Sequence, residues 1–323
     1  MRIAVSGRIA RQPILAALAA LPDVEVVEAA APALPGHVAD CDALVLSDPR
    51  GDEGEDLTEA LRQPDARTRW LQVVSAGCSG LLSHPLPAGL VVTNQGGAAA
   101  AAVAEHAIAL ILAHNRCLPA ALLARADARW EREAVRPGLR TLEAATIVIV
   151  GLGHVGRALA MRLAPFQATT IGINRTGTPC PDVRMTLPMA RLNEALASAD
   201  TIVLCLPATP ETYRLIDARR LAMLKPGALV VNVGRGDLID MAALAQALAH
   251  GHLGGAALDV TDPEPLPPDH ELWRAPNLIV TPHIAGGGSP LTGMRIAGLV
   301  AENAGRFLRG QPLLAQVYPK VAA

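Results

Sequence analysis

The chain has 323 residues, of which 51% are hydrophobic, 18% charged and only 2% aromatic, and its formal net charge is −2. The apolar fraction excludes a disordered chain. The near-neutral charge and the scarcity of aromatic rings exclude an electrostatic or stacking surface for nucleic acid, and the charge also argues against binding to an anionic membrane surface.

In the first hundred residues, short runs rich in Val and Ile alternate with helical stretches, which predicts βαβ units and a parallel sheet. We expect strands at 3–5, 24–27, 43–46, 71–74 and 90–93, and a helix at 13–21. Residues rich in Pro and Gly predict loops at 32–36 and 49–54.

An apolar stretch at 98–115 contains Glu105 and His106, so it is too short and too polar to span a membrane. We expect a buried helix there that links two lobes, with His106 as a buried linking residue. A second α/β set follows, with strands expected at 147–150, 169–173, 202–204, 229–233, 256–258 and 278–280 and helices at 155–163, 192–198, 241–249 and 290–308.

The five cysteines are widely spaced and form no CxxC pair or Cys/His cluster. This pattern argues against a disulfide framework and against a structural metal site, so we expect no metal and a reducing compartment. The N-terminus lacks the long apolar run of a signal peptide. We therefore expect a cytoplasmic protein.

A glycine-rich loop follows the strand expected at 147–150. Its glycines, Gly151, Gly153 and Gly156, have the GxGxxG spacing between a strand and a helix. In that setting the first glycine makes the tight turn, the second lets the backbone approach a pyrophosphate and the third packs the helix on the strand. The amides of His154 and Val155 would then face the phosphates, so the loop predicts a dinucleotide site; an ordinary βα turn is the alternative.

The end of the next strand bears on the cofactor. Proteins that bind NAD usually have Asp or Glu there for the ribose 2′-hydroxyl, whereas this chain has Asn174, Arg175 and Thr176. With no carboxylate to repel it, a 2′-phosphate can pair with Arg175, helped by its two neighbours. The sequence favours NADP, with NAD possible; the alternative is a solvent-facing Arg.

Three further residues follow expected strands and form a coherent chemical set: Arg235, Glu264 and His283. Arg suits a carboxylate, His holds and releases a proton near neutral pH, and a carboxylate orients and charges the His. Strand ends near a reversal of strand order are where open α/β sheets bind ligands. Alone, each residue would as readily be structural.

From about residue 91 to 313 the chain resembles the NAD(P)-dependent D-isomer-specific 2-hydroxyacid dehydrogenases, in particular the glyoxylate/hydroxypyruvate reductase-like members. The matching segments are VTNQGGAAAAAVAEHAIALIL, GLGHVGRALAMRL, CLPATPETYRLID, LKPGALVVNVGRGDLID, ALDVTDPEPLP and LWRAPNLIVTPHIAGG. The resemblance of the first ninety residues is weaker and mostly architectural.

The resemblance implies that Arg235 holds the carboxylate and carbonyl oxygen of a small 2-oxo acid, that His283 protonates that oxygen and that Glu264 keeps the imidazole protonated. The further cofactor contacts it implies are Leu206, Pro207, Thr212, Val233, Gly234 and Asp259. The substrate contacts it implies, besides Arg235, are the backbone of Ala76, Gly77 and Cys78, with Cys78 lining the site.

The fold that we expect is α/β, with two Rossmann-like or flavodoxin-like lobes of parallel sheet. An inner dinucleotide-binding lobe at 97–287 is inserted into a discontinuous outer substrate lobe at 1–96 and 288–323, and closure of the lobes would exclude water. The resemblance also implies a homodimer.

Several activities remain open. Glyoxylate or hydroxypyruvate reduction with NADPH leads; phosphite oxidation and a sugar-acid (2-ketogluconate-type) dehydrogenase are alternatives. Glu264 argues against formate dehydrogenases, which have Gln there, and the lack of an extension after Ala323 argues against the longer phosphoglycerate dehydrogenases. A nucleotide-sensing binding protein of the same fold is the non-enzymatic alternative.

Overall fold

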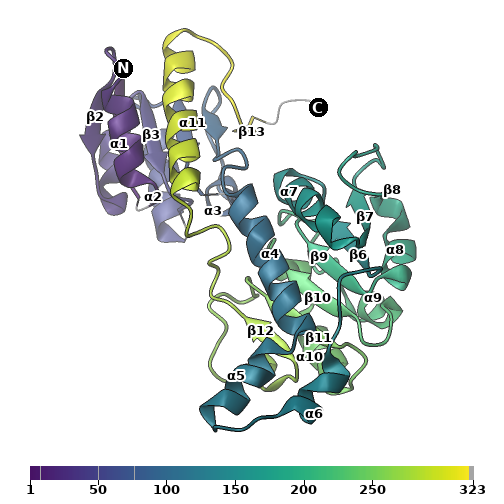
Figure 1. The fold of residues 1–323 in the computed structure, drawn as a ribbon. Helices are drawn as coiled ribbons and strands as arrows, with labels where there is room; N and C mark the ends of the chain where they lie inside the picture. The colour runs from purple at the N-terminus through teal and green to yellow at the C-terminus, as the bar shows by residue number, and fades with distance from the viewer. Residues whose placement is uncertain (8, 50, 76, 320–323) are drawn as a thin grey trace. The chain divides into compact units, whose positions relative to one another are not determined.

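The computed structural model describes residues 1–7, 9–49, 51–75 and 77–319. The chain divides into two compact units: unit 1 is Met1–Ala99 with Gly288–Ala323, and unit 2 is Ala100–Gly287 (Figure 1). Each unit has its own sheet with helices on both faces, so the prediction of two α/β lobes is confirmed.

Among the described residues of unit 1, the sheet has the strand order β13-β5-β4-β3-β1-β2. The strands are β1 Arg2–Val5, β2 Glu25–Glu28, β3 Ala43–Leu46, β4 Trp70–Val73, β5 Val91–Thr93 and β13 Gln316–Tyr318. The first five are parallel in the flavodoxin-like order, whereas β13 pairs antiparallel with β5. The sequence analysis did not predict β13.

Both faces of this sheet are buried, because successive side chains of a strand point to opposite faces. Ile3 and Val5 of β1 pack with α1 (Arg11–Ala19) and α11 (Pro290–Leu308), which lie side by side. Ala4 faces the other cluster, formed with η1 (Ala31–His37), α2 (Asp52–Leu61) and α3 (Ser79–Leu82).

The loop predicted at 49–54 is wrong, because α2 begins at Asp52. Asp52, Glu53 and Glu55 lie in the first turn of the helix. Negative charge there stabilises the helix, because it interacts favourably with the unpaired amides and with the positive end of the helix dipole. Pro and Gly in this stretch suggested a loop, whereas its acidic residues are typical of a helix N-terminus.

Unit 2 contains a sheet that, in its described residues, is parallel throughout and has the order β12-β11-β10-β9-β6-β7-β8. The strands are β6 Thr146–Val150, β7 Thr169–Asn174, β8 Met185–Pro188, β9 Thr201–Leu204, β10 Leu229–Asn232, β11 Gly255–Leu258 and β12 Leu278–Val280. The order is that of a doubly wound dinucleotide-binding fold, with one further strand at the β12 edge.

Helices cover both faces of the sheet in unit 2. On one face, β6 and β9 residues pack with α4 (Ala100–Asn115) and α7 (His154–Leu163); on the other they pack with α8 (Leu192–Ser198), α9 (Ala218–Met223) and α10 (Met241–Ala249). The remaining helical segments of the unit are α5 Leu118–Ala126, α6 Arg132–Val135, η2 Arg136–Gly138, η3 Ala164–Phe166, η4 Met189–Arg191, η5 Gly236–Leu238 and η6 Glu271–Arg274.

In the described part of the chain, no single helix is long and apolar enough to cross a membrane. By length and composition alone, one pair of helices bent by 65°, α4 with α5, meets the same test.

The C-terminal turn of α4 is anchored by His114, whose ring packs against the backbone of Gly255 in β11. Burial, with a smaller contribution from the nearby Arg140 guanidinium, lowers the pKa of His114 to about 4. The ring is therefore neutral at physiological pH and acts as packing rather than as a charge.

Candidate active site

The order of strands in unit 2 reverses between β6 and β9, and this is where open α/β sheets bind ligands beyond the strand ends. The glycine loop leaves β6 at this point, and residues 205–212 leave β9. Within that second loop, the Thr212 hydroxyl donates to the carbonyl of Pro207 at 2.9 Å and accepts from the amide of Thr209 at 2.8 Å. Through these two hydrogen bonds Thr212 stabilises the conformation of the loop that contains Leu206 and Pro207.

The three glycines of the loop have different reasons to lack a side chain. Gly151 has a φ of 103°, and a Cβ there would lie 2.9 Å from the carbonyl oxygen of Cys205. A Cβ on Gly156 would lie 1.9 Å from the carbonyl oxygen of Gly151. A Cβ on Gly153 would meet nothing within 4 Å. Gly151 and Gly156 are therefore required by the fold, whereas Gly153 leaves space in front of the helix.

The N-terminus of α7 faces that space. Gly153 is its N-cap residue, with no side-chain cap, and the helix begins with His154 and Val155. Uncapped amides at the start of a ten-residue helix attract anions. These residues fit the pyrophosphate of a dinucleotide. Burial raises the pKa of the nearby Cys205 thiol to about 12, which favours its protonated form.

The end of β7 forms a tight turn around Asn174. Its Oδ1 accepts from the amides of Thr176 at 3.2 Å and Gly177 at 2.6 Å, and its Nδ2 donates to the carbonyl of Thr178 at 2.8 Å. Asn174 is thus committed to shaping the turn. By contrast, Arg175 is exposed, and its guanidinium has no hydrogen-bond or ion-pair partner among the described residues.

The turn that carries Arg235 follows β10 and is held by Asn232, a fully buried residue that the sequence analysis did not single out. The Asn232 side chain accepts from the amide of Gly234 at 3.0 Å and donates to the carbonyl of Arg235 at 2.7 Å. The Arg235 guanidinium in turn donates to the carbonyl of Gly234 at 2.7 Å.

The glycines on either side of Arg235 let three loops approach one another. A Cβ on Gly234 would lie 2.8 Å from the carbonyl oxygen of Leu206, after β9. A Cβ on Gly236 would lie 2.0 Å from the carbonyl oxygen of Thr261, after β11. The loop of Arg235 is thus packed between its two neighbours at the carboxyl edge of the sheet.

His283 and Glu264 are directly paired. Nδ1 of His283 lies 2.7 Å from Oε1 of Glu264, with both side chains about one-third exposed. Because an ionised carboxylate only accepts hydrogen bonds, Nδ1 carries the hydrogen and Nε2 is left for another partner. In the described residues no hydrogen bond or ion pair joins Arg235 to either side chain. Arg235 follows β10, which is paired with β11, the strand that precedes Glu264.

The backbone at His283 is in the left-handed region, with a φ of 53°. Two features hold it there. The His283 amide donates to the carbonyl of Asp259 at 2.9 Å, and the Asp259 carboxylate accepts from the amides of Ile284 at 3.0 Å and Ala285 at 2.9 Å. The Asp259 side chain is only 2% exposed.

Two residues that the sequence analysis did not assign to the site complete this arrangement. The Thr281 hydroxyl donates to Oδ1 of Asp259 at 2.6 Å, and Nε2 of His106 lies 2.9 Å from the Thr281 hydroxyl oxygen. The expectation that His106 links two lobes is wrong, because these contacts lie within unit 2. Thr281 could have been found from the TPH sequence at 281–283, because it places a hydroxyl two residues before His283.

The other predicted site residues are placed as follows. Val233 is buried after β10, in the turn that Asn232 holds. Gly77 and Cys78 lie in unit 1, where the Ser75 hydroxyl donates to the carbonyl of Gly77 at 3.0 Å. Ala76 lies outside the described residues. The substrate and cofactor contacts expected of these residues stay predictions.

Comparison with known proteins identifies the family. The profile of "D-isomer specific 2-hydroxyacid dehydrogenase, NAD binding domain" matches residues 108–285, more than half of the chain. The chain belongs to the D-isomer specific 2-hydroxyacid dehydrogenase family. It follows that the protein is related to NAD(P)-dependent oxidoreductases and has the nicotinamide-dinucleotide domain of that family.

Two relatives with named activities match about the same share of this chain. A glyoxylate reductase of Thermofilum pendens is 36% identical over 69% of this chain and 66% of its own length. A D-3-phosphoglycerate dehydrogenase of Mycobacterium bovis is 37% identical over 69% of this chain, but the match spans only 42% of that enzyme.

A solved structure extends the similarity to nearly the whole chain. The D-isomer specific 2-hydroxyacid dehydrogenase of Xanthobacter autotrophicus Py2, in complex with NADPH and MES, is 30% identical with a TM-score of 0.82 and covers 98% of both chains.

Alanine at two glycines of the loop is expected to separate folding from binding. In Gly156→Ala the Cβ collides with backbone, so we expect a lower free energy of unfolding together with lost NADPH binding. In Gly153→Ala the Cβ enters open space, so stability stays within about 0.5 kcal/mol while NADPH binding weakens. Urea unfolding and NADPH fluorescence measure the two effects, and unchanged binding in folded Gly153→Ala would contradict this assignment.

Proposed function

We propose that the protein catalyses the reversible reduction of a small 2-oxo acid to its D-2-hydroxy acid with NADPH, with glyoxylate or hydroxypyruvate as substrate. The direct pairing of His283 with Glu264 carries this proposal, because it supplies a proton donor and the charge that supports it. The pair belongs to the same unit as the glycine loop. The similarity to a glyoxylate reductase supports the choice of substrate class.

The chemistry divides among few side chains. A nicotinamide dinucleotide held by the glycine loop would supply or accept the hydride. As negative charge develops on the carbonyl oxygen, Nε2 of His283 donates its proton there, since Nδ1 is engaged with Glu264. The planar fork of Arg235 pairs with the substrate carboxylate. Asp259 and Thr281 keep the backbone of His283 in place.

The test of this function is a panel of 2-oxo acids assayed with both NADPH and NADH. We expect the highest kcat/KM with glyoxylate or hydroxypyruvate. Oxidation of phosphite, or a higher kcat/KM with a sugar acid, would show that the proposed substrate is wrong but that the protein is still a dehydrogenase. Tight dinucleotide binding with no turnover of any acid would favour a nucleotide-sensing protein.

The preference for NADP is supported by the turn after β7. Asn174 shapes the turn, no acidic residue is present at 174–176, and the exposed Arg175 guanidinium has no partner among the described residues. A side chain in this state is available to pair with the 2′-phosphate. The Xanthobacter relative with bound NADPH is consistent with this choice.

We further propose that the protein is a homodimer. Exposed apolar side chains gather on and after α5: Leu122 is 59% exposed, Leu123 is 70% exposed and Trp130 is 94% exposed. Such residues are typical of an interface, where their burial is favourable. Sedimentation analysis should give twice the chain mass, and Leu123→Glu should give the monomer; a monomeric native protein would refute the dimer.

We also propose that it resides in the cytoplasm. The five cysteines are widely spaced and form no CxxC pair, a pattern typical of proteins in a reducing compartment. Cell fractionation tests this; recovery of the protein outside the cytoplasm would refute it.

Arg175→Ala should weaken NADPH much more than NADH. Loss of a charge-assisted contact to the 2′-phosphate costs about 1.5–3 kcal/mol, which is about 10- to 150-fold in KM for NADPH. NADH lacks that phosphate, so its KM should hardly change. Arg219→Ala, at an exposed position on α9, is the matched control. Equal effects of Arg175→Ala on both cofactors would place the guanidinium away from the phosphate.

Glu264→Gln should lower kcat/KM for the 2-oxo acid at least tenfold while leaving NADPH binding unchanged. The amide keeps the shape of the carboxylate but loses the negative charge that strengthens the 2.7 Å contact with Nδ1 of His283. Glu271→Gln, an exposed position in η6, should leave kcat/KM unchanged. His283→Ala should abolish most turnover but not NADPH binding. Unchanged kcat/KM in Glu264→Gln would disprove the coupling.

A further inference from the structure

A turn in unit 1 brings three potential metal-binding side chains together. It joins the end of η1 to the start of β3 and carries His37, Asp40 and Cys41. One ligand atom from each, an imidazole nitrogen, a carboxylate oxygen and the thiol sulfur, lies within 4.8 Å of the other two. The spacing i, i+3, i+4 places these side chains on one face of a helical turn.

The distance between His37 and Asp40 is informative. Nδ1 of His37 lies 3.7 Å from Oδ1 of Asp40, which is too long for a hydrogen bond. Two donor atoms about 2.0 Å from one tetrahedral ion lie about 3.3 Å apart. The pair is therefore close to the spacing of two ligands on a shared ion.

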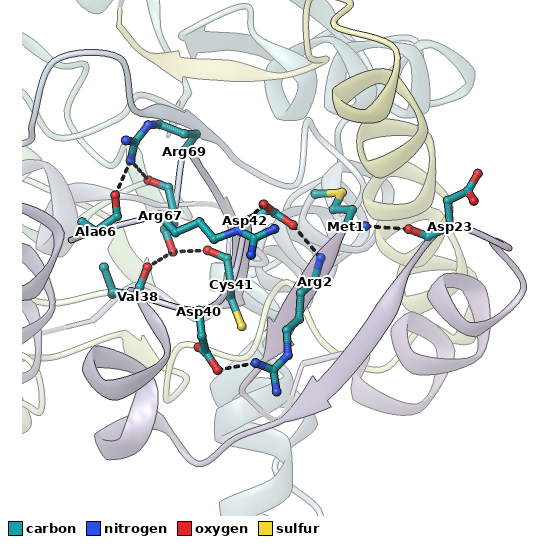
Figure 2. Close-up of polar contacts among 11 residues, drawn as sticks. Met1, Arg2, Asp23, Val38, Asp40, Cys41, Asp42, Ala66, Arg67 and Arg69 are labelled. Atoms are coloured by element: carbon teal, nitrogen blue, oxygen red, sulfur yellow. Dashed lines mark hydrogen bonds and ion pairs between the residues drawn. The ribbon is translucent and has the colours of Figure 1, made fainter.

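The two oxygens of Asp40 differ in their surroundings. Oδ2 accepts from the Arg2 guanidinium, as Figure 2 shows, whereas Oδ1 is buried and makes no hydrogen bond of ordinary geometry among the described residues. The Cys41 thiol is near enough to interact with the same carboxylate, so the proposed ligand groups face one another. Arg2 thus fixes the carboxylate from outside, as the outer hydrogen-bond partners of metal ligands do, and leaves Oδ1 directed at His37.

The charges around the turn do not oppose a cation. Arg2 is balanced by Glu25, 3.2 Å away, as well as by Asp40, and Arg67 is paired with Asp42 at 2.8 Å. Cys41 is fully buried, and the side chains of His37 and Asp40 are 26% and 43% exposed. The sulfur is therefore the most buried of the three donor atoms, and the imidazole and the carboxylate lie nearer to solvent.

We propose that His37, Asp40 and Cys41 bind a Zn²⁺ ion, with water as the fourth ligand. Imidazole, carboxylate and thiolate are the ligands that Zn²⁺ accepts in tetrahedral sites. Binding transfers the thiol proton of Cys41 to solvent, so that the thiolate and carboxylate together neutralise the ion. No metal was expected from the sequence because the cysteines form no CxxC pair and no evident Cys/His cluster; the single His37 and Cys41, four residues apart, were not recognised as a set with Asp40.

Co²⁺ added to the metal-free full-length protein is the test. We expect one equivalent to bind with a thiolate-to-cobalt absorption band in the near ultraviolet, and Zn²⁺ to displace it. Cys41→Ser should lose the band. His37→Ala should keep the fold and weaken Co²⁺ binding at least tenfold, since even outer partners of metal ligands contribute that much.

His84→Ala and Cys117→Ser are the matched controls and should bind Co²⁺ as the native protein does. If Cys41→Ser does not fold, His37→Ala decides. A missing thiolate band in the native protein, a band that survives in Cys41→Ser, or unchanged affinity in His37→Ala would each overturn the site and leave Asp40 as the partner of Arg2 alone.

Discussion

The buried carboxylate of Asp259 is the interaction on which the candidate active site depends. It accepts hydrogen bonds from two backbone amides and from the Thr281 hydroxyl. The backbone carbonyl of Asp259 also accepts a hydrogen bond from the His283 amide. A left-handed backbone at a residue other than glycine costs about 1–3 kcal/mol, and these contacts offset that cost. Because Thr281 gives its hydrogen to Asp259, its oxygen accepts from Nε2–H of His106. Helix α4 thereby takes part in positioning a loop 175 residues further along the chain.

The carboxyl edge of the sheet in unit 2 can be crowded only because glycines remove side chains where loops meet. Gly151, Gly234 and Gly236 each have a backbone carbonyl oxygen 2.0–2.9 Å from where a Cβ would stand. Any larger residue would push the loops apart and with them the residues they carry. Gly153 differs from these glycines, because no atom of the described residues lies within 4 Å of where its Cβ would stand. Its lack of a side chain is therefore not required by packing, and it leaves the open space that the proposed dinucleotide site needs.

Much of this architecture could be predicted from the sequence. Buried parallel strands are continuous apolar runs, so β3, β6 and β11 were located to within a residue. The edge strands β8 and β13 were missed, since Met185–Pro188 and Gln316–Tyr318 are short and carry no such run. The chemistry of the residues that follow the expected strands, together with the family resemblance, predicted Glu264 and His283 as a pair. Neither predicted the roles of Asn232 and Thr281, because a side chain that binds backbone leaves no periodic pattern.

The two carboxylates near His283 divide two tasks by their exposure. Asp259 is 2% exposed, and its oxygens accept from two backbone amides and the Thr281 hydroxyl, so it fixes the backbone at His283. Glu264 is 30% exposed and contacts the imidazole directly. In the proposed reaction a proton leaves and returns to the imidazole with each turnover, and a partner that water can reach compensates this change of charge better than a fully buried carboxylate. The buried carboxylate therefore determines where His283 stands, and the exposed one is the partner of its ring.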